Sequence, residues 1–290
     1  MSDLYVVVEE ISLVDCHAHI SAKEFDEDVE GVIEEAKKVG VKVVVGVTES
    51  RAEFGAMIDL HNRYPDFVAP CLGVHPVQSL CPDRCATLED LEGVEELIRE
   101  HQDKLVAIGE VCESLMLKPE KHSVGLDFTP RFIKTELDKV SQREVFSRQI
   151  KLAIELDLPL NVHSRSAGRH VIEMLLEHGA KNVILHAFDG KPSNARKGIE
   201  AGYYFSIPPS IVRSPQKEKL VKSVPLSNLL LETDSPALAA EKQTRNEPKN
   251  VCISCQAISR IKGVPVHTVY EETTKNALKL FPKLQRFIRK

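Results

Sequence analysis

Eight short runs of apolar, mainly β-branched residues recur along this 290-residue chain, with helical patterns between them. The runs are residues 11–19, 41–48, 67–75, 105–111, 159–164, 182–188, 203–208 and 229–234. Most are continuously apolar, which is typical of parallel strands that are buried on both faces. Because parallel strands need crossover connections, this alternation restricts the chain to α/β folds.

The helical patterns between the runs carry recognisable end signals. The clearest segments are residues 25–40, 87–101, 142–157, 167–179 and 250–263. The first ends at Gly40, a typical helix terminator, and the second begins with Thr87 and has Asp90 three residues later, close to a capping box. Eight strand–helix repeats in a chain of this length predict one (β/α)8 barrel domain over residues 1–290. An open, doubly wound sheet is the structural alternative.

Composition excludes several classes of protein. Hydrophobic residues make up 42% of the chain and charged residues 28%, as in ordinary globular proteins. No apolar run approaches the roughly 18–20 residues of a membrane span, and the acidic start does not resemble a signal peptide. Seven scattered cysteines fit a reducing compartment, so we expect an intracellular protein of the cytoplasm or nucleus, without membrane contact. The net charge of −5 argues against a broad basic surface for nucleic acid, although bound cations could make a cleft positive.

Polar residues stand where the predicted strands end. His17 and His19 close the first strand and alternate, so their side chains are expected on one face. The later strands end in Glu110, His163, His186 and Asp234. Because the carboxyl ends of barrel strands form one mouth, we expect these six side chains to converge there. Each lies in apolar sequence, where a lone charge or imidazole is costly unless it is paired or binds a metal.

Four imidazoles and two carboxylates suit two divalent ions, with zinc preferred and manganese or magnesium as alternatives. Glu110 is central in strand order, and its two oxygens could bridge two ions. Two ions about 3.5–4 Å apart could activate a shared hydroxide to attack a phosphoryl or carbonyl centre. Singly, each residue has a structural explanation, such as a hydrogen-bonded core histidine or, for Asp234, a helix cap. Together, at one barrel end, they favour a metal site.

The chain resembles a known family through a set of short motifs. VDCHAHI, CLGVHP, AIGEV, GLDF, NVHSR, LLETDSPAL and RNEP stand in the order seen in TatD-type metal-dependent deoxyribonucleases of the amidohydrolase superfamily. The resemblance runs from about residue 11 to the C-terminus, and GVHPVQ, HSRSAGR, HAFDG and FSIPPSI are most similar to a vertebrate branch. It implies hydrolysis of phosphodiester bonds in DNA single strands or ends, with a 3′-to-5′ exonuclease preference.

The resemblance also implies roles for individual residues. One metal is expected on His17, His19 and Asp234, and the other on His163 and His186, with Glu110 between them. Asp234, which with Glu110 makes the expected catalytic pair, would orient or deprotonate the attacking water. His75 could contact a substrate phosphate or make a loop hydrogen bond, and Arg165 could pair with phosphate or form a structural ion pair. Asp15 is expected in the barrel interior or behind the two histidines.

The chain departs from the family pattern in one place. GEV at 109–111 and GLDF at 125–128 are separated by thirteen residues, 112–124. A mouth loop of that length is tolerable because loop entropy grows slowly with length. The insert nevertheless puts the placement of Glu110 and Asp127 in doubt, and we interpret it as a bulge without function rather than a regulatory loop.

Two other functions remain open at this stage. The same metal centre could serve a superfamily hydrolase that acts on a small amide, ester or lactone. Alternatively, the insert could leave a structural or impaired metal site in a barrel that acts through partners, although no obligate protein partner is predicted. The pairs Cys252/Cys255 and Cys81/Cys85 could suggest a structural zinc, but the first pair lies in a helical pattern, and a helix face is the preferred interpretation.

Overall fold

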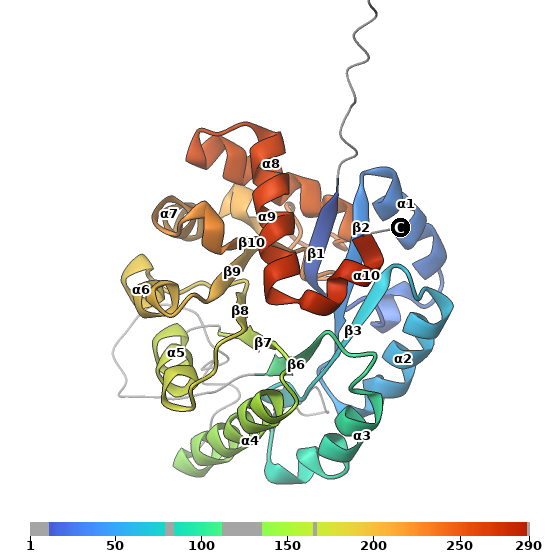
Figure 1. Cartoon of the computed structure of the whole chain (residues 1–290), viewed down its shortest axis with the longest axis vertical. Coiled ribbons are helices and arrows are strands. Elements are labelled where there is room, and N and C mark those ends of the chain that lie inside the picture. Colours follow the sequence, from blue (N-terminus) through green and yellow to red (C-terminus); the bar gives the residue numbers. More distant parts are fainter. Residues whose placement is uncertain (1–11, 79–83, 112–134, 165–166, 289–290) are drawn as a thin grey trace, which may run out of the picture.

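Eight parallel strands form one sheet that curves into a barrel, and helices surround it (Figure 1). The computed structural model describes residues 12–78, 84–111, 135–164 and 167–288. The strands are β1 (Leu13–Ala18), β2 (Val41–Val47), β3 (Val68–Leu72), β6 (Ala107–Val111), β7 (Leu160–His163), β8 (Val183–His186), β9 (Tyr204–Ile207) and β10 (Leu229–Leu231), adjacent in that order. All eight predicted strands are present, so the barrel prediction is confirmed and the open-sheet alternative is wrong.

Most helices lie around the outside of the barrel, and the short last helix lies across one end of it (Figure 1). The helices are α1 (Val29–Lys38), α2 (Phe54–Arg63), α3 (Val94–His101), α4 (Glu136–Glu155), α5 (Gly168–Glu177), α6 (Pro192–Glu200), α7 (Pro215–Ser223), α8 (Val251–Lys262), α9 (Val266–Leu280) and α10 (Gln285–Ile288). A small antiparallel hairpin of β4 (Val77–Gln78) and β5 (Arg84–Cys85) lies between β3 and α3 in the chain. None of the helices within the described residues has the length and apolar character of a membrane span.

The predicted helix at 87–101 divides into two elements. A 3-10 turn, Leu88–Leu91, opens with the predicted capping box of Thr87 and Asp90. Gly93 then has a positive φ of 69°, and α3 begins at the next residue. The left-handed backbone at this glycine interrupts the helix, which the amphipathic pattern alone did not reveal. Gly40, predicted to end the helix at 25–40, also has a positive φ, of 92°.

The barrel closes through a seam between the first and last strands. The Asp234 N–H donates to the His17 carbonyl at 2.9 Å, and the His19 N–H donates to the Ser235 carbonyl at 2.8 Å. This pairing lies just beyond the regular end of β10, which is shorter than the predicted run of 229–234. Asp234 has a φ of 56°, so the backbone leaves the extended conformation there. The seam therefore brings Asp234 next to both histidines of β1.

Apolar side chains fill the barrel interior at the end where the strands begin. Val14, Val43 and Leu230, near the starts of their strands, belong to one buried cluster with Phe281 and Leu284 from the C-terminal segment. A larger buried cluster lies between the outer strand faces and the helices. The C-terminal segment thus closes one end of the barrel, and the carboxyl ends of the parallel strands form the opposite mouth.

Strands β3, β6 and β7 approach closely just beneath this mouth. A Cβ on Gly109 would lie 2.5 Å from the Asn161 carbonyl oxygen, and a Cβ on Gly73 would lie 2.6 Å from the backbone of Gly109. Both contacts are with backbone atoms, which cannot move aside as a flexible side chain can. The absence of side chains at these glycines is therefore what lets the three strands pack at this spacing.

This packing predicts the effect of adding one methyl group. Gly109→Ala should lower the free energy of unfolding by about 1–3 kcal/mol, because the added carbon overpacks a rigid backbone contact. Gly31→Ala in α1 is the matched control, because a Cβ there meets nothing within 4 Å. The control should gain up to about 1 kcal/mol from better helix propensity. Urea denaturation measures both, and equal midpoints for Gly109→Ala and wild type would contradict the packing argument.

Candidate metal centre

The six side chains predicted as ligands meet at the mouth of the barrel. His17 comes from β1, Glu110 from β6, His163 from β7 and His186 from β8. His19 directly follows β1, and Asp234 lies three residues beyond the end of β10. His163 and His186 are paired in register between β7 and β8. The ring of His17 stacks on that of His186 with centroids 3.7 Å apart, although β1 and β8 are not neighbours in the sheet.

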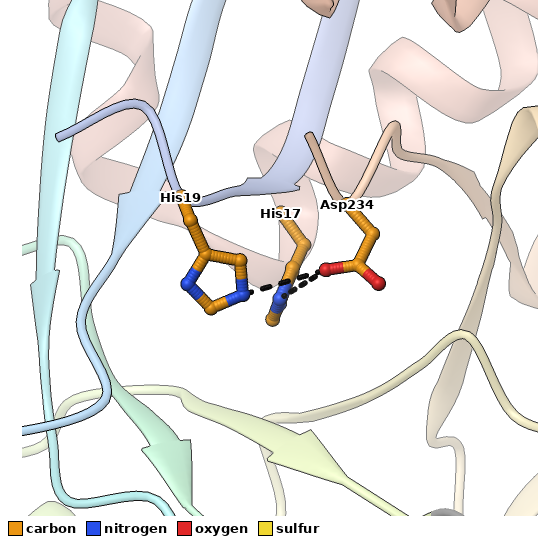
Figure 2. A group of neighbouring side chains, drawn as sticks. All are labelled: His17, His19 and Asp234. Atoms are coloured by element: carbon orange, nitrogen blue, oxygen red, sulfur yellow. Dashed lines mark ion pairs between the residues drawn. The ribbon is translucent and has the colours of Figure 1, made fainter. Parts of the chain in front are cut away.

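One group of four atoms has the spacing of a tetrahedral coordination shell. His17 Nε2 lies 3.5 Å from Glu110 Oε2 and 3.4 Å from Asp234 Oδ1. His19 Nε2 lies 3.4 Å from each of the same two oxygens. Figure 2 shows both imidazoles turned toward one oxygen of Asp234. Ligands about 2.1 Å from a tetrahedral ion stand about 3.4 Å from one another, so this arrangement fits a zinc-sized cation.

The other oxygen of Glu110 faces a second group of histidines. Glu110 Oε1 lies 2.6 Å from His163 Nδ1, 2.7 Å from His186 Nε2 and 3.7 Å from His75 Nε2. His163 Nδ1 and His186 Nε2 are 2.8 Å apart. The two oxygens of one buried carboxylate therefore face two separate groups of nitrogen atoms. The 2.6–2.8 Å separations in the second group are hydrogen-bond distances, shorter than the ligand spacing in the first.

A buried amide orients His17 toward the first group. Asn161 Nδ2 donates to the Cys16 carbonyl at 3.0 Å, so its Oδ1 faces His17 Nδ1 at 2.9 Å. In the neutral form of His17, Nδ1 then carries the proton, which leaves the lone pair of Nε2 directed at the carboxylates. His17 Nε2, His163 Nε2 and His186 Nδ1 are buried and have no hydrogen-bond partner among the described residues. Of these three, His17 Nε2 faces the two carboxylates, so this unpartnered nitrogen fits a site that binds a metal ion.

The charges at the centre are strongly coupled. Burial opposes ionisation of Glu110, but the surrounding histidines outweigh it and hold the pKa of Glu110 well below its usual value. Burial likewise opposes protonation of His19, yet its hydrogen bonds with Asp234 and Glu110 raise its pKa to about 10. Burial lowers the pKa of His186 to about 3. The carboxylates of Glu110 and Asp234 are therefore stabilised by positive charge between them, which protons or a divalent cation can supply.

Sequence reasoning missed two residues that support the ligands. Glu232 is fully buried, accepts from the Ala187 N–H at 2.8 Å and lies 3.8 Å from His186 Nδ1. Asn161, described above, is the other. Each precedes a predicted ligand by two positions, so the period of two along a strand could have identified both.

The remaining predicted residues have different outcomes. His75 lies at the second group, with its ring centroid 4.8 Å from that of His163, and its contact with a substrate phosphate stays a prediction. Asp15 is fully buried in the barrel and accepts from the Thr233 N–H at 2.9 Å, which confirms its interior placement behind His17. Arg165 lies outside the described residues, so its phosphate contact stays a prediction.

The insert at 112–124 and Asp127 also lie outside the described residues. Glu110 nevertheless occupies the centre of the cluster, within β6. Cys252 and Cys255 lie on α8, half-buried and buried respectively, which confirms the helix-face interpretation. Cys81 lies outside the described residues, and its predicted partner Cys85 is buried in β5.

A (β/α)8 barrel that gathers imidazoles and carboxylates at the carboxyl ends of its strands is the architecture of a metal-dependent hydrolase. The sequence model of the TatD related DNase family matches residues 14–282. The chain therefore belongs to this family, as the motifs predicted.

Individual relatives agree with this assignment. A human protein named Deoxyribonuclease TATDN3 is 54% identical over 282 residues, which is 97% of this chain and 98% of that protein. A Bacillus subtilis protein named Uncharacterized metal-dependent hydrolase YabD is 34% identical over 93% of this chain and 98% of its own length. The crystal structure of YJJV, a TatD homolog from Escherichia coli, has a TM-score of 0.79 at 22% identity, and covers 93% of this chain and 98% of its own. That likeness shows the shared fold.

The Asn161 contact generates a prediction about metal affinity. Asn161→Ala should weaken metal binding by about 10–100-fold, because His17 loses the acceptor that orients its ring. Competition with a chromogenic chelator measures this affinity. Asn62→Ala, at an exposed position on α2, is the control and should bind metal as the wild type does. Wild-type affinity in Asn161→Ala would show that the amide does not orient the ligand.

Proposed function

We propose that this protein is a metal-dependent deoxyribonuclease that hydrolyses phosphodiester bonds in DNA, with a 3′-to-5′ exonuclease preference. The observation that carries the proposal is the division of the Glu110 oxygens between two groups of nitrogen atoms. This division supports a centre for two divalent ions. Membership of the TatD related DNase family and the name of the human relative support DNA as the substrate.

The ligand assignment follows the two groups. The proposed first ion is held by His17, His19 and Asp234, and the second by His163 and His186, with Glu110 between them. The imidazole-rich set favours zinc, and manganese or magnesium are the alternatives; magnesium prefers oxygen ligands. Divalent ions held there would lower the pKa of water and stabilise charge on a phosphoryl oxygen.

The side chains of the chain itself position the reactants. One oxygen of Asp234 faces the two histidines, while the other points away from them (Figure 2). That second oxygen is placed to accept a proton from an attacking water. His75 lies at the edge of the second group, where its ring could donate to a substrate phosphate. The walls of the barrel bury His17, Glu110, His163 and His186, which strengthens these electrostatic interactions.

Removing the bridging charge tests the two-ion centre. Glu110→Gln keeps the shape of the side chain but should reduce bound metal from two ions per chain to one or fewer, and nuclease turnover by at least about 100-fold. Elemental analysis of the dialysed protein measures the metal. Glu155→Gln, on the exposed side of α4, is the control and should retain both ions. Two ions in Glu110→Gln would refute the bridge, and less than one ion in wild type would favour a non-enzymatic barrel.

The substrate class needs a separate measurement. Metal-loaded protein should shorten a single-stranded DNA oligonucleotide labelled at its 5′ end into a ladder, because removal begins at the 3′ end. A chelator should abolish the ladder, and added Zn²⁺ or Mn²⁺ should restore it. A panel of small esters, amides and lactones is assayed in parallel. Turnover of the panel without cleavage of DNA would replace the deoxyribonuclease proposal with a small-molecule hydrolase.

A further inference from the structure

A cavity of about 320 Å³ opens directly beside the metal centre. Three of the proposed ligands, His163, His186 and Asp234, line it together with residues of the segment between β9 and α7, of α7 itself, and of the loops after β8 and β10. Its polar lining residues outside the metal centre are Asp189, Ser210, Arg213, Ser214 and Lys217. The cavity is near the lower end of the roughly 300–1,000 Å³ range of small-ligand sites, so it suits a single nucleotide-sized group.

The wall between β9 and α7 carries donors and positive charge. The Ser210 side chain is buried, with 3% of the residue exposed, and its hydroxyl has no hydrogen-bond partner among the described residues. Lys217 is also buried, at 7% exposure, and its Nζ donates to the Ala187 carbonyl at 2.7 Å. Arg213 also lines the cavity and is exposed to solvent. A buried hydroxyl without a partner is costly, so it indicates a ligand that the protein chain does not supply.

The wall is held in place by contacts between two loops. The Ser210 N–H donates to the Leu238 carbonyl at 2.9 Å, and Arg213 Nε donates to the Ala239 carbonyl at 3.2 Å. The Ser214 side chain caps α7 by accepting from the Lys217 N–H, so the positive end of this nine-residue helix borders the cavity. The donors are therefore positioned before any ligand arrives, which reduces the entropic cost of binding.

The charges on this wall favour an anion. Arg213 and Lys217 contribute two positive charges, and Asp189 contributes one negative charge. Asp234 belongs to the metal centre, where bound cations would neutralise it. A hydroxyl, a guanidinium and a helix N-terminus are the groups that proteins use to bind phosphate oxygens.

We propose that this cavity is a phosphate-binding subsite, in which Ser210, Arg213 and Lys217 hold a phosphate group of the substrate next to the one being cleaved. The inference rests on the proposed function and deepens it, because it assigns substrate recognition to the segment between β9 and α7. A neighbouring phosphate distinguishes a nucleic-acid strand from an isolated phosphodiester. The same groups would bind the phosphate of a released nucleotide.

Calorimetry tests the subsite without relying on turnover. Inorganic phosphate and thymidine 5′-monophosphate are titrated into the full chain, with and without added Zn²⁺. Arg213→Gln and Ser210→Ala should each weaken binding of both probes by about tenfold, since a hydrogen bond to a charged group is lost. Arg63→Gln is the control, because the guanidinium of Arg63 lies on α2 beside Tyr64. This variant should bind both probes as tightly as the wild type does. Unchanged affinity in both subsite variants would overturn the proposal.

Kinetics separate the subsite from the metal centre. Arg213→Gln should raise KM on a single-stranded oligonucleotide at least fivefold more than on bis(4-nitrophenyl) phosphate, which has no second phosphate. Equal losses on the two substrates would show that Arg213 does not recognise a neighbouring phosphate. If the wild type cleaves neither substrate, the proposed function fails, whereas the calorimetric comparison still decides the subsite. Bound metal and the thermal midpoint of each variant confirm that it is folded and loaded.

Discussion

A buried carboxylate surrounded by imidazoles is the interaction on which the rest of this structure depends. Glu110 is 2% exposed, and such a charge is stable in a barrel interior only with compensating positive charge. Its two oxygens divide the histidines into two groups, one with the Asp234 carboxylate and one without. The strands must therefore hold five other side chains within a few ångströms of one glutamate. Backbone contacts between neighbouring strands set the distance between those strands.

The closure of the barrel and the geometry of the centre depend on the same hydrogen bonds. The hydrogen bonds that join residues 17–19 to residues 234–235 complete the seam between β1 and β10, and the same pairing places Asp234 against the two histidines. Asp15 strengthens the seam from below by accepting from both the N–H and the hydroxyl of Thr233. A change that loosens the seam should therefore affect stability and metal binding together.

The electrostatics differ between the molecule as a whole and its mouth. The chain has a net charge of −5, which does not attract nucleic acid over its general surface. Local features at the mouth act in the opposite direction: the proposed metal ions, Arg213, Lys217 and the N-terminus of α7. Recognition of an anionic substrate is thus confined to a small region, where each positive group is fixed by a hydrogen bond to the backbone or by a helix cap.

The sequence alone determined the positions of the eight strands, because buried parallel strands require continuous apolar runs. It also determined which polar residues stand at the strand ends, because the functional residues of a barrel lie at the carboxyl ends of its strands. It could not show how the oxygens of Glu110 divide, or that Asn161 orients His17. These facts depend on side-chain contacts between strands that are far apart in the chain, such as the stacking of His17 on His186. Local pattern records which face a residue occupies, whereas only the curvature and closure of the sheet decide which residues meet across the barrel.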